Sequence, residues 1–110
     1  MRKLPILLYI CLLAPSLLSQ TTDSPSHKPR SGYVPDADTA IKIGEAVLIP
    51  VYGANQIDSE QPFTATLTGN SIWVVTGTLH CKGAGSCDGG VATVSITKDD
   101  GRVLSMTHGK

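Results

Sequence analysis

The period of the apolar residues changes once along this chain, and that change constrains the fold more than any other feature. Ala40, Ile43, Val47 and Val51 recur at a spacing of three to four residues, which is typical of one face of an α-helix. After Pro62, apolar residues alternate with threonine or serine, and this period of two predicts half-buried strands. The chain is therefore predicted to place one helix before a set of strands.

The ends of the predicted helix carry clear signals. Asp36 is expected to cap the first turn, where Asp38 is favourable against the positive end of the helix dipole. Pro50 has no amide hydrogen, so we expect the helix to kink or tighten there before Gly53 ends it. The polar residues 54–62 are predicted to form a turn.

Four strands are predicted after this turn, at residues 63–68, 71–79, 91–97 and 102–108. Gly69-Asn70 predicts a tight turn between the first two strands, and Asp99-Asp100-Gly101 predicts another between the last two. In the last strand, Leu104 and Met106 are expected on one face. A helix lying across one face of a four-stranded antiparallel meander buries both the helix stripe and the apolar strand faces, so the predicted class is α+β.

A basic and apolar segment opens the chain. Arg2 and Lys3 precede an apolar run that ends at Leu18, and small and polar residues follow, which is the layout of a secretory signal peptide. We expect residues 1–19 to be removed, with cleavage within about residues 16–20, and the product to be periplasmic or secreted. The run is shorter than the roughly 20 residues that cross a bilayer, so we expect no membrane span after signal removal.

The remaining chain is predicted to hold a linker and one domain. Residues 20–32 are polar and lack apolar periodicity, which predicts a flexible linker before a single domain at residues 33–110. Once Arg2 and Lys3 are removed, seven lysines and arginines oppose nine aspartates and glutamates, a formal charge of −2. This charge gives no electrostatic case for binding nucleic acid or anionic lipid.

Two cysteines remain after removal of the signal, because Cys11 lies within it. Cys81 and Cys87 are predicted to form a disulfide, which an oxidising compartment favours and which would add about 2 kcal/mol of stability. The flanking His80 and Asp88 raise the alternative of a zinc site. The spacing matches no common zinc pattern, so we expect no metal and no cofactor.

Few residues stand out as candidates for binding a partner. Asp58 and Glu60 lie one residue apart in the predicted turn, where they form either a small acidic patch or a solvated loop. Trp73 either packs against the helix or serves as an exposed anchor. His80 and Asp88, beside the cysteines, complete the candidate set.

Catalysis has little support in the sequence. A nucleophile and base need a histidine held close to a serine, threonine or cysteine. The histidines after the signal are His27 in the linker, His80 beside the cysteines and His108 near the end, and each is expected to be solvated. The chain is therefore not expected to be an enzyme.

Several short motifs follow one another from residue 39 to the end. They are Thr39-Ala40-Ile41-Lys42-Ile43, Val51-Tyr52-Gly53, Gln61-Pro62-Phe63, Trp73-Val74-Val75-Thr76-Gly77-Thr78-Leu79, Gly89-Gly90-Val91-Ala92, Asp100-Gly101-Arg102-Val103-Leu104 and His108-Gly109-Lys110. In this order they resemble the immunity proteins of bacterial polymorphic-toxin systems that have a nuclear-transport-factor-two-like fold. The resemblance runs from about Tyr33 to the end and implies an antidote that binds and blocks a cognate toxin without catalysis.

The export signal sharpens what the resemblance implies. An exported antidote cannot guard a cytosolic target, so the toxin is expected to act in the periplasm or on the cell envelope. One alternative is a periplasmic binding or protease-inhibitor module, resembling peptidase-inhibitory domains of cystatin-like fold. Another is an enzyme, because larger relatives of the fold house hydrolases and isomerases. A homodimer formed through an exposed sheet edge also stays open.

Overall fold

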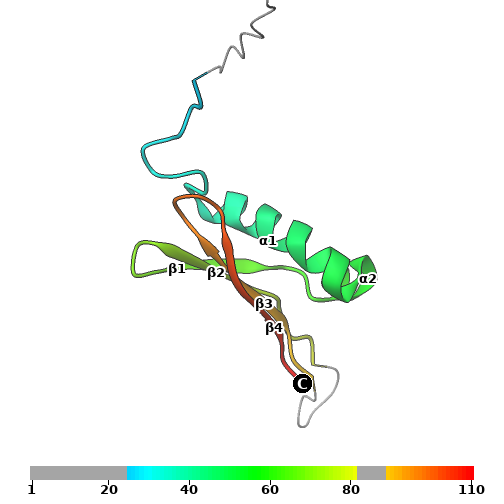
Figure 1. The fold of residues 1–110 in the computed structure, drawn as a ribbon. Coiled ribbons are helices and arrows are strands. Elements are labelled where there is room, and N and C mark those ends of the chain that lie inside the picture. The colour runs from blue at the N-terminus through cyan, green and yellow to red at the C-terminus, as the bar shows by residue number, and fades with distance from the viewer. Residues whose placement is uncertain (1–24, 82–88) are drawn as a thin grey trace, which may run out of the picture.

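The computed structural model describes residues 25–81 and 89–110, so the predicted signal peptide lies outside the described residues. Helix α1 (Ala37–Tyr52) and helix α2 (Ala54–Ser59) precede four strands. The strands are β1 (Thr64–Thr68), β2 (Ile72–Thr76), β3 (Ala92–Thr97) and β4 (Val103–His108). They form one antiparallel sheet in the order β1-β2-β3-β4, and α1 lies across one of its faces (Figure 1). The predicted α+β class is confirmed.

Helix α1 begins and ends where the sequence predicts. The Asp36 side chain accepts a hydrogen bond of 2.8 Å from the Thr39 N–H, as an N-cap should. Pro50 lies inside the helix, which continues to Tyr52. Gly53 then adopts a φ of 92°, and its N–H donates to the Ile49 carbonyl at 2.8 Å.

The buried stripe of α1 differs from the predicted one. Ala40, Gly44 and Leu48 are its buried residues, whereas Val51 is 61% exposed. At Gly44 a Cβ atom would lie 2.9 Å from a methyl group of Val75, so the missing side chain lets the helix approach the sheet closely. The prediction for Val51 was wrong because Gly44, which has no side chain to count as apolar, lies closest to the sheet, and Ala40 and Leu48 share its face of the helix.

The turn predicted at residues 54–62 was also wrong, because helix α2 occupies most of it. Gly53 redirects the chain with its positive φ, and a second helix starts at the next residue. Ile57 is 1% exposed and anchors this helix to the core. Six residues with one buried apolar side chain carry no helical period that a sequence pattern can detect.

The alternation in β1 and β3 is confirmed. In β1 the threonines are exposed, while Ala65 and Leu67 are partly buried. In β3 the side chains of Ala92, Val94 and Ile96 are all 0% exposed. The Gly69-Asn70 turn also forms, with both residues at positive φ.

The predicted pairing of Leu104 with Met106 on one face of β4 was wrong. Ser95 lies opposite Ser105, but the next residue, Ile96, lies opposite Val103, so the register skips Leu104. This β-bulge leaves Leu104 45% exposed, while Met106 is half-buried against the core.

The segment before α1 joins the sheet at the turn between β3 and β4. The Tyr33 N–H donates to the Asp99 carbonyl at 2.9 Å, and the Val34 N–H donates to the Lys98 carbonyl at 3.0 Å. Val34 is fully buried. The beginning of the predicted domain therefore belongs to the same core as the sheet.

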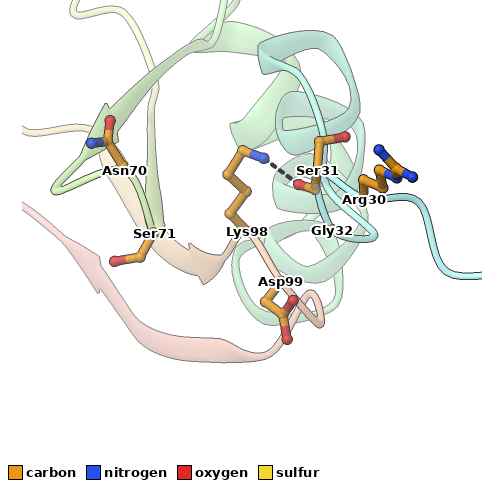
Figure 2. Close-up of a pocket in the computed structure, with 7 residues that line it drawn as sticks. All are labelled: Arg30, Ser31, Gly32, Asn70, Ser71, Lys98 and Asp99. Atoms are coloured by element: carbon orange, nitrogen blue, oxygen red, sulfur yellow. Dashed lines mark hydrogen bonds between the residues drawn. The ribbon is translucent and has the colours of Figure 1, made fainter.

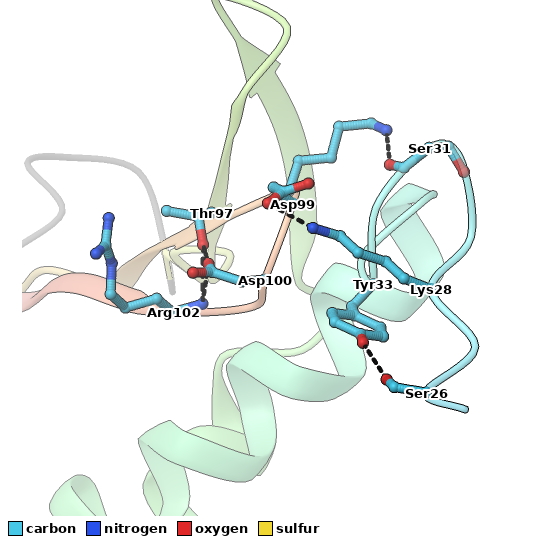
Figure 3. Close-up of polar contacts among 9 residues, drawn as sticks. Ser26, Lys28, Ser31, Tyr33, Thr97, Asp99, Asp100 and Arg102 are labelled. Carbon is cyan, nitrogen blue, oxygen red and sulfur yellow. Dashed lines mark hydrogen bonds and ion pairs between the residues drawn. The ribbon is translucent and has the colours of Figure 1, made fainter. Parts of the chain in front are cut away.

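Polar side chains extend these contacts into the predicted linker (Figure 3). Lys28 forms an ion pair with Asp99 at 2.7 Å, and the Lys98 ammonium group donates to the Ser31 carbonyl. At Gly32 a Cβ atom would overlap the Lys98 carbonyl oxygen, and the residue has a φ of 90° that favours glycine. The Ser26 hydroxyl also lies 2.9 Å from the Tyr33 hydroxyl, so side-chain contacts with the folded part reach back to Ser26, and the linker boundary stays a prediction.

Candidate functional site

Among the residues that the structure describes, Glu60 is the one charged residue that is buried, with 4% of its surface exposed. It follows the last turn of α2, and its carboxylate contacts three other segments. One oxygen accepts from the Ala92 N–H at the start of β3, at 2.5 Å. The other accepts from the Gln56 amide at 3.0 Å and lies 3.1 Å from Nε2 of His108, at the end of β4. The carboxylate therefore ties α2 to both C-terminal strands.

His108 completes this cluster from the sheet side. Its Nδ1 lies 2.7 Å from the Gly109 carbonyl oxygen, and its ring centroid lies 5.1 Å from that of Tyr52. A carbonyl and a carboxylate oxygen only accept hydrogen bonds, so the arrangement suits the imidazolium form, which donates from both ring nitrogens. The side chain is 23% exposed, against 5% for Glu60.

The two groups favour each other's charged forms. The Gly109 carbonyl, and then the Glu60 carboxylate, raise the pKa of His108 above its ordinary value, although burial opposes them. Burial raises the pKa of Glu60, but hydrogen bonds from Gln56, Ala92 and His108 together outweigh it and leave the pKa below its ordinary value.

The pair makes stability depend on pH in a defined direction. Because the pKa of His108 is raised in the folded state, its contribution is full below the ordinary value of 6.5 and is lost as the pH rises through the folded pKa. The contribution of Glu60 is full above its ordinary value of 4.5 and is lost as the pH falls through the lowered pKa. Both contributions are therefore complete between these two ordinary values.

We expect the wild-type free energy of unfolding to fall between about pH 6 and pH 8, and to fall less in a His108→Gln variant. Urea unfolding across this range measures the difference. His80→Gln, which changes an exposed histidine whose ring contacts the Gln61 carbonyl and not Glu60, is the comparison variant. Equal slopes for wild type and His108→Gln would contradict the assignment.

The structure separates the two carboxylates that were predicted to lie together. Asp58 is exposed on α2, whereas Glu60 is buried, so the expectation that Glu60 forms part of a solvated loop or acidic patch was wrong. Residues two apart near a helix end point in different directions, which accounts for the separation. His108 was also expected to be solvated, and its pairing with Glu60 corrects that.

The other predicted site residues lie apart from this cluster. Trp73 is 8% exposed and its Nε1–H donates to the Val34 carbonyl at 2.8 Å, so it packs in the core and is no exposed anchor. His80 is exposed, with Nε2 2.5 Å from the Gln61 carbonyl oxygen. Cys87 and Asp88 lie outside the described residues, so the Cys81–Cys87 disulfide stays a prediction.

A cavity of about 330 Å³ lies beside the buried carboxylate. Its lining includes Glu60, Thr78, His80 and Gly90. Both carboxylate oxygens of Glu60 accept hydrogen bonds from the chain itself, and both nitrogens of its partner His108 contact oxygen atoms of the chain. The pair therefore fixes the ends of α2, β3 and β4, and its hydrogen-bonding atoms are taken up by described residues of the chain.

A second cavity, of about 230 Å³, lies between the N-terminal segment and the two hairpin turns (Figure 2). It is lined by Arg30, Ser31, Gly32, Asn70, Ser71, Lys98 and Asp99. Lys98 reaches across to Ser31, and the Arg30 side chain points away from the other lining residues. The cationic groups at this cavity are therefore not gathered around one point.

Residues 25–81 and 89–110 contain neither a metal-binding cluster nor a helix that could span a membrane. Within these ranges no three or more His, Cys, Asp or Glu side chains are grouped so as to hold a metal ion. None of the helices there is long and apolar enough to cross a membrane.

Comparison with known proteins places this fold in a family. Residues 39–110 match the family described as NTF2 fold immunity protein. The chain is also 37% identical over 71 residues to the uncharacterized protein YhhH of Escherichia coli (strain K12), an alignment that covers 64% of this chain and 53% of that relative. The chain thus spans about half the length of this relative. No solved structure matches the chain. On the match over residues 39–110, the chain belongs to the NTF2-fold immunity protein family.

Proposed function

We propose that the chain is an exported immunity protein that binds a cognate toxin in the periplasm or on the cell envelope and blocks it sterically, without catalysis. The observation that carries the proposal is the family match over residues 39–110, because the members of this family are immunity proteins. The proposed export from the cytoplasm is supported by the basic pair and the apolar run within residues 1–19. In that compartment we expect Cys81 and Cys87 to form the predicted disulfide.

The chemistry of the best-buried polar cluster supports a role without catalysis. A general acid or base must reach the substrate within hydrogen-bond distance. Glu60 and His108 instead contact Gln56, Ala92 and Gly109, so they act as structural links between segments.

The proposal predicts protection that depends on the compartment. The product of the neighbouring gene is expressed as the toxin, directed either to the periplasm or to the cytoplasm, together with the full chain or with a chain lacking residues 1–19. We expect the full chain to restore growth against the periplasmic toxin and the shortened chain to fail. Colony counts measure the rescue.

The shortened chain needs a control, because loss of rescue would also follow from misfolding. Replacing residues 1–19 with an unrelated cleavable signal peptide should restore protection. Protection by the shortened chain against cytoplasmic toxin, with none by the full chain against periplasmic toxin, would contradict export. Binding of a housekeeping protease together with absence of rescue would favour the protease-inhibitor alternative.

A further inference from the structure

The sheet has two edge strands, β1 and β4, because the strand order is β1-β2-β3-β4. An edge strand presents backbone N–H and C=O groups that have no partner within the sheet. Natural proteins protect such edges with charged side chains, proline or β-bulges, and they leave an edge open where another chain is to pair with it.

The register shows which backbone groups of β1 face the open edge. At the end of β2, the Gly77 N–H donates to the Ala92 carbonyl of β3 at 3.0 Å. Backbone groups alternate in direction along a strand, so Thr76 and Val74 face β1, where their partners are Thr64 and Thr66. The N–H and C=O groups of the residues between these partners, starting with Ala65, therefore point to the open edge.

The two edges are protected differently. The β4 strand carries the bulge at Leu104, follows Arg102, and ends at His108, which is held by Glu60. The β1 strand, Thr-Ala-Thr-Leu-Thr, has no charged residue, no proline and a regular register over all five residues. By the criteria that keep edges from pairing, β4 is protected and β1 is open.

The core is also less covered at β1 than at the central strands. Ala65 and Leu67 point toward the core yet are only partly buried. The corresponding inward residues of β2 and β3, such as Val75 and Val94, are fully buried. A strand added beside β1 would cover apolar surface as well as pair with the backbone.

An acidic pocket of about 340 Å³ lies where the chain leads into β1. Gln61, three residues before the strand, lines it together with Glu45, Ile49 and Asp58. Ile49 is 40% exposed. One oxygen of Glu45 accepts a hydrogen bond of 2.7 Å from the Gln61 amide, and within the described ranges neither Glu45 nor Asp58 forms an ion pair. A lysine or arginine suits this pocket, because its aliphatic stem packs on apolar surface while its charge meets the carboxylates.

We propose that an extended segment of the toxin adds a strand to the open edge of β1 and places a lysine or arginine side chain in this pocket; this inference rests on the proposed immunity function. The outward-facing N–H and C=O groups of β1 can form regular hydrogen bonds with the backbone of another extended polypeptide. A second copy of this chain is the poorer occupant, because residues 61–71, which would lie along the edge in a symmetric β1 pair, contain no lysine or arginine.

Amide hydrogen exchange of the wild-type chain tests the proposal directly. The purified chain is mixed with the product of the neighbouring gene, and exchange is followed by NMR. We expect the exchange rates of the Ala65 and Leu67 amides to be at least about tenfold lower in the complex than in the free chain. The Met106 amide, which faces outward on the β4 edge, serves as the internal control and should keep its rate.

Three substitutions test the edge and its pocket by affinity for the toxin, and one of them is a control. Ala65→Pro removes one outward N–H at a position where an edge strand tolerates proline, and we expect it to weaken toxin binding about tenfold. Met106→Pro makes the matched change on the other edge and should leave the affinity unchanged. Asp58→Lys reverses one charge of the pocket and should also weaken toxin binding. Far-UV circular dichroism checks that each of the three variants is folded.

The outcomes separate this inference from the proposed function. If the toxin binds and the Ala65 and Leu67 amides keep their exchange rates, the edge assignment is wrong and the immunity function stands. If these amides become protected with rising concentration of the chain alone, the occupant is a second copy and the inference is overturned. If wild type neither binds nor protects, both proposals fail.

Discussion

Replacing Glu60 with alanine is expected to lower the free energy of unfolding by about 3 kcal/mol. The substitution leaves the Ala92 N–H without its acceptor in a buried position and removes the charge that supports the His108 imidazolium. It also frees the Gln56 side chain and loosens the end of α2. Urea unfolding of the purified variant at about pH 6, where both groups carry their charges, measures the loss.

Asp58→Ala is the matched control for this prediction. Asp58 is an exposed carboxylate two residues earlier, so its removal should change stability by no more than about 0.5 kcal/mol. Glu60→Gln keeps the size and one acceptor for the Ala92 N–H, so its loss should lie between those of the two alanine variants. A loss at Glu60 no larger than that at Asp58 would show that the buried cluster contributes little.

Leu48→Ala is expected to cost about 3 kcal/mol, because it removes three carbon atoms from a site with no exposure and leaves a cavity against the sheet. Val51→Ala, one turn later on the same helix, should cost no more than about 0.5 kcal/mol, because Val51 is 61% exposed. Thermal and urea unfolding of the two variants compare the observed stripe with the one that apolar spacing predicts. A larger loss for Val51 would mean that α1 packs with the other face.

The substitution at Glu60 should also affect the surface that we propose for toxin binding. The Glu60 carbonyl accepts from the Thr78 N–H at 2.7 Å, so this residue joins α2 to the chain after β2 through its backbone as well. Helix α2 carries Asp58 to the acidic pocket beside β1. The Glu60 cluster therefore holds in place one wall of the surface that we propose for the toxin.

Local pattern predicted the parts of the fold that depend on near neighbours. The alternation of apolar residues with threonine in β1 and β3 was readable because successive side chains of a strand point to opposite faces. The cap at Asp36 and the turn at Gly69-Asn70 could also be predicted, because each depends on a few residues and their own backbone preferences. The order of helix and strands followed from these local signals.

Single residues without a period escaped prediction. Helix α2 has one buried apolar side chain, Ile57, so no repeating pattern marked it. Gly44 has no side chain to count as apolar, yet its close contact with Val75 sets which face of α1 meets the sheet. The bulge at Leu104 shifts one strand by one residue, and the sequence carries no mark of that shift.

The sequence by itself determined the class of this protein: an N-terminal helix, four alternating strands and the turns that make them antiparallel, because local backbone and burial preferences act over a few residues. Only the tertiary structure decided the site. Glu60 and His108 lie 48 residues apart, and their contact depends on α2 and on the register of β3 with β4. The open edge of β1 depends likewise on strand order, which emerges only when the whole sheet is assembled.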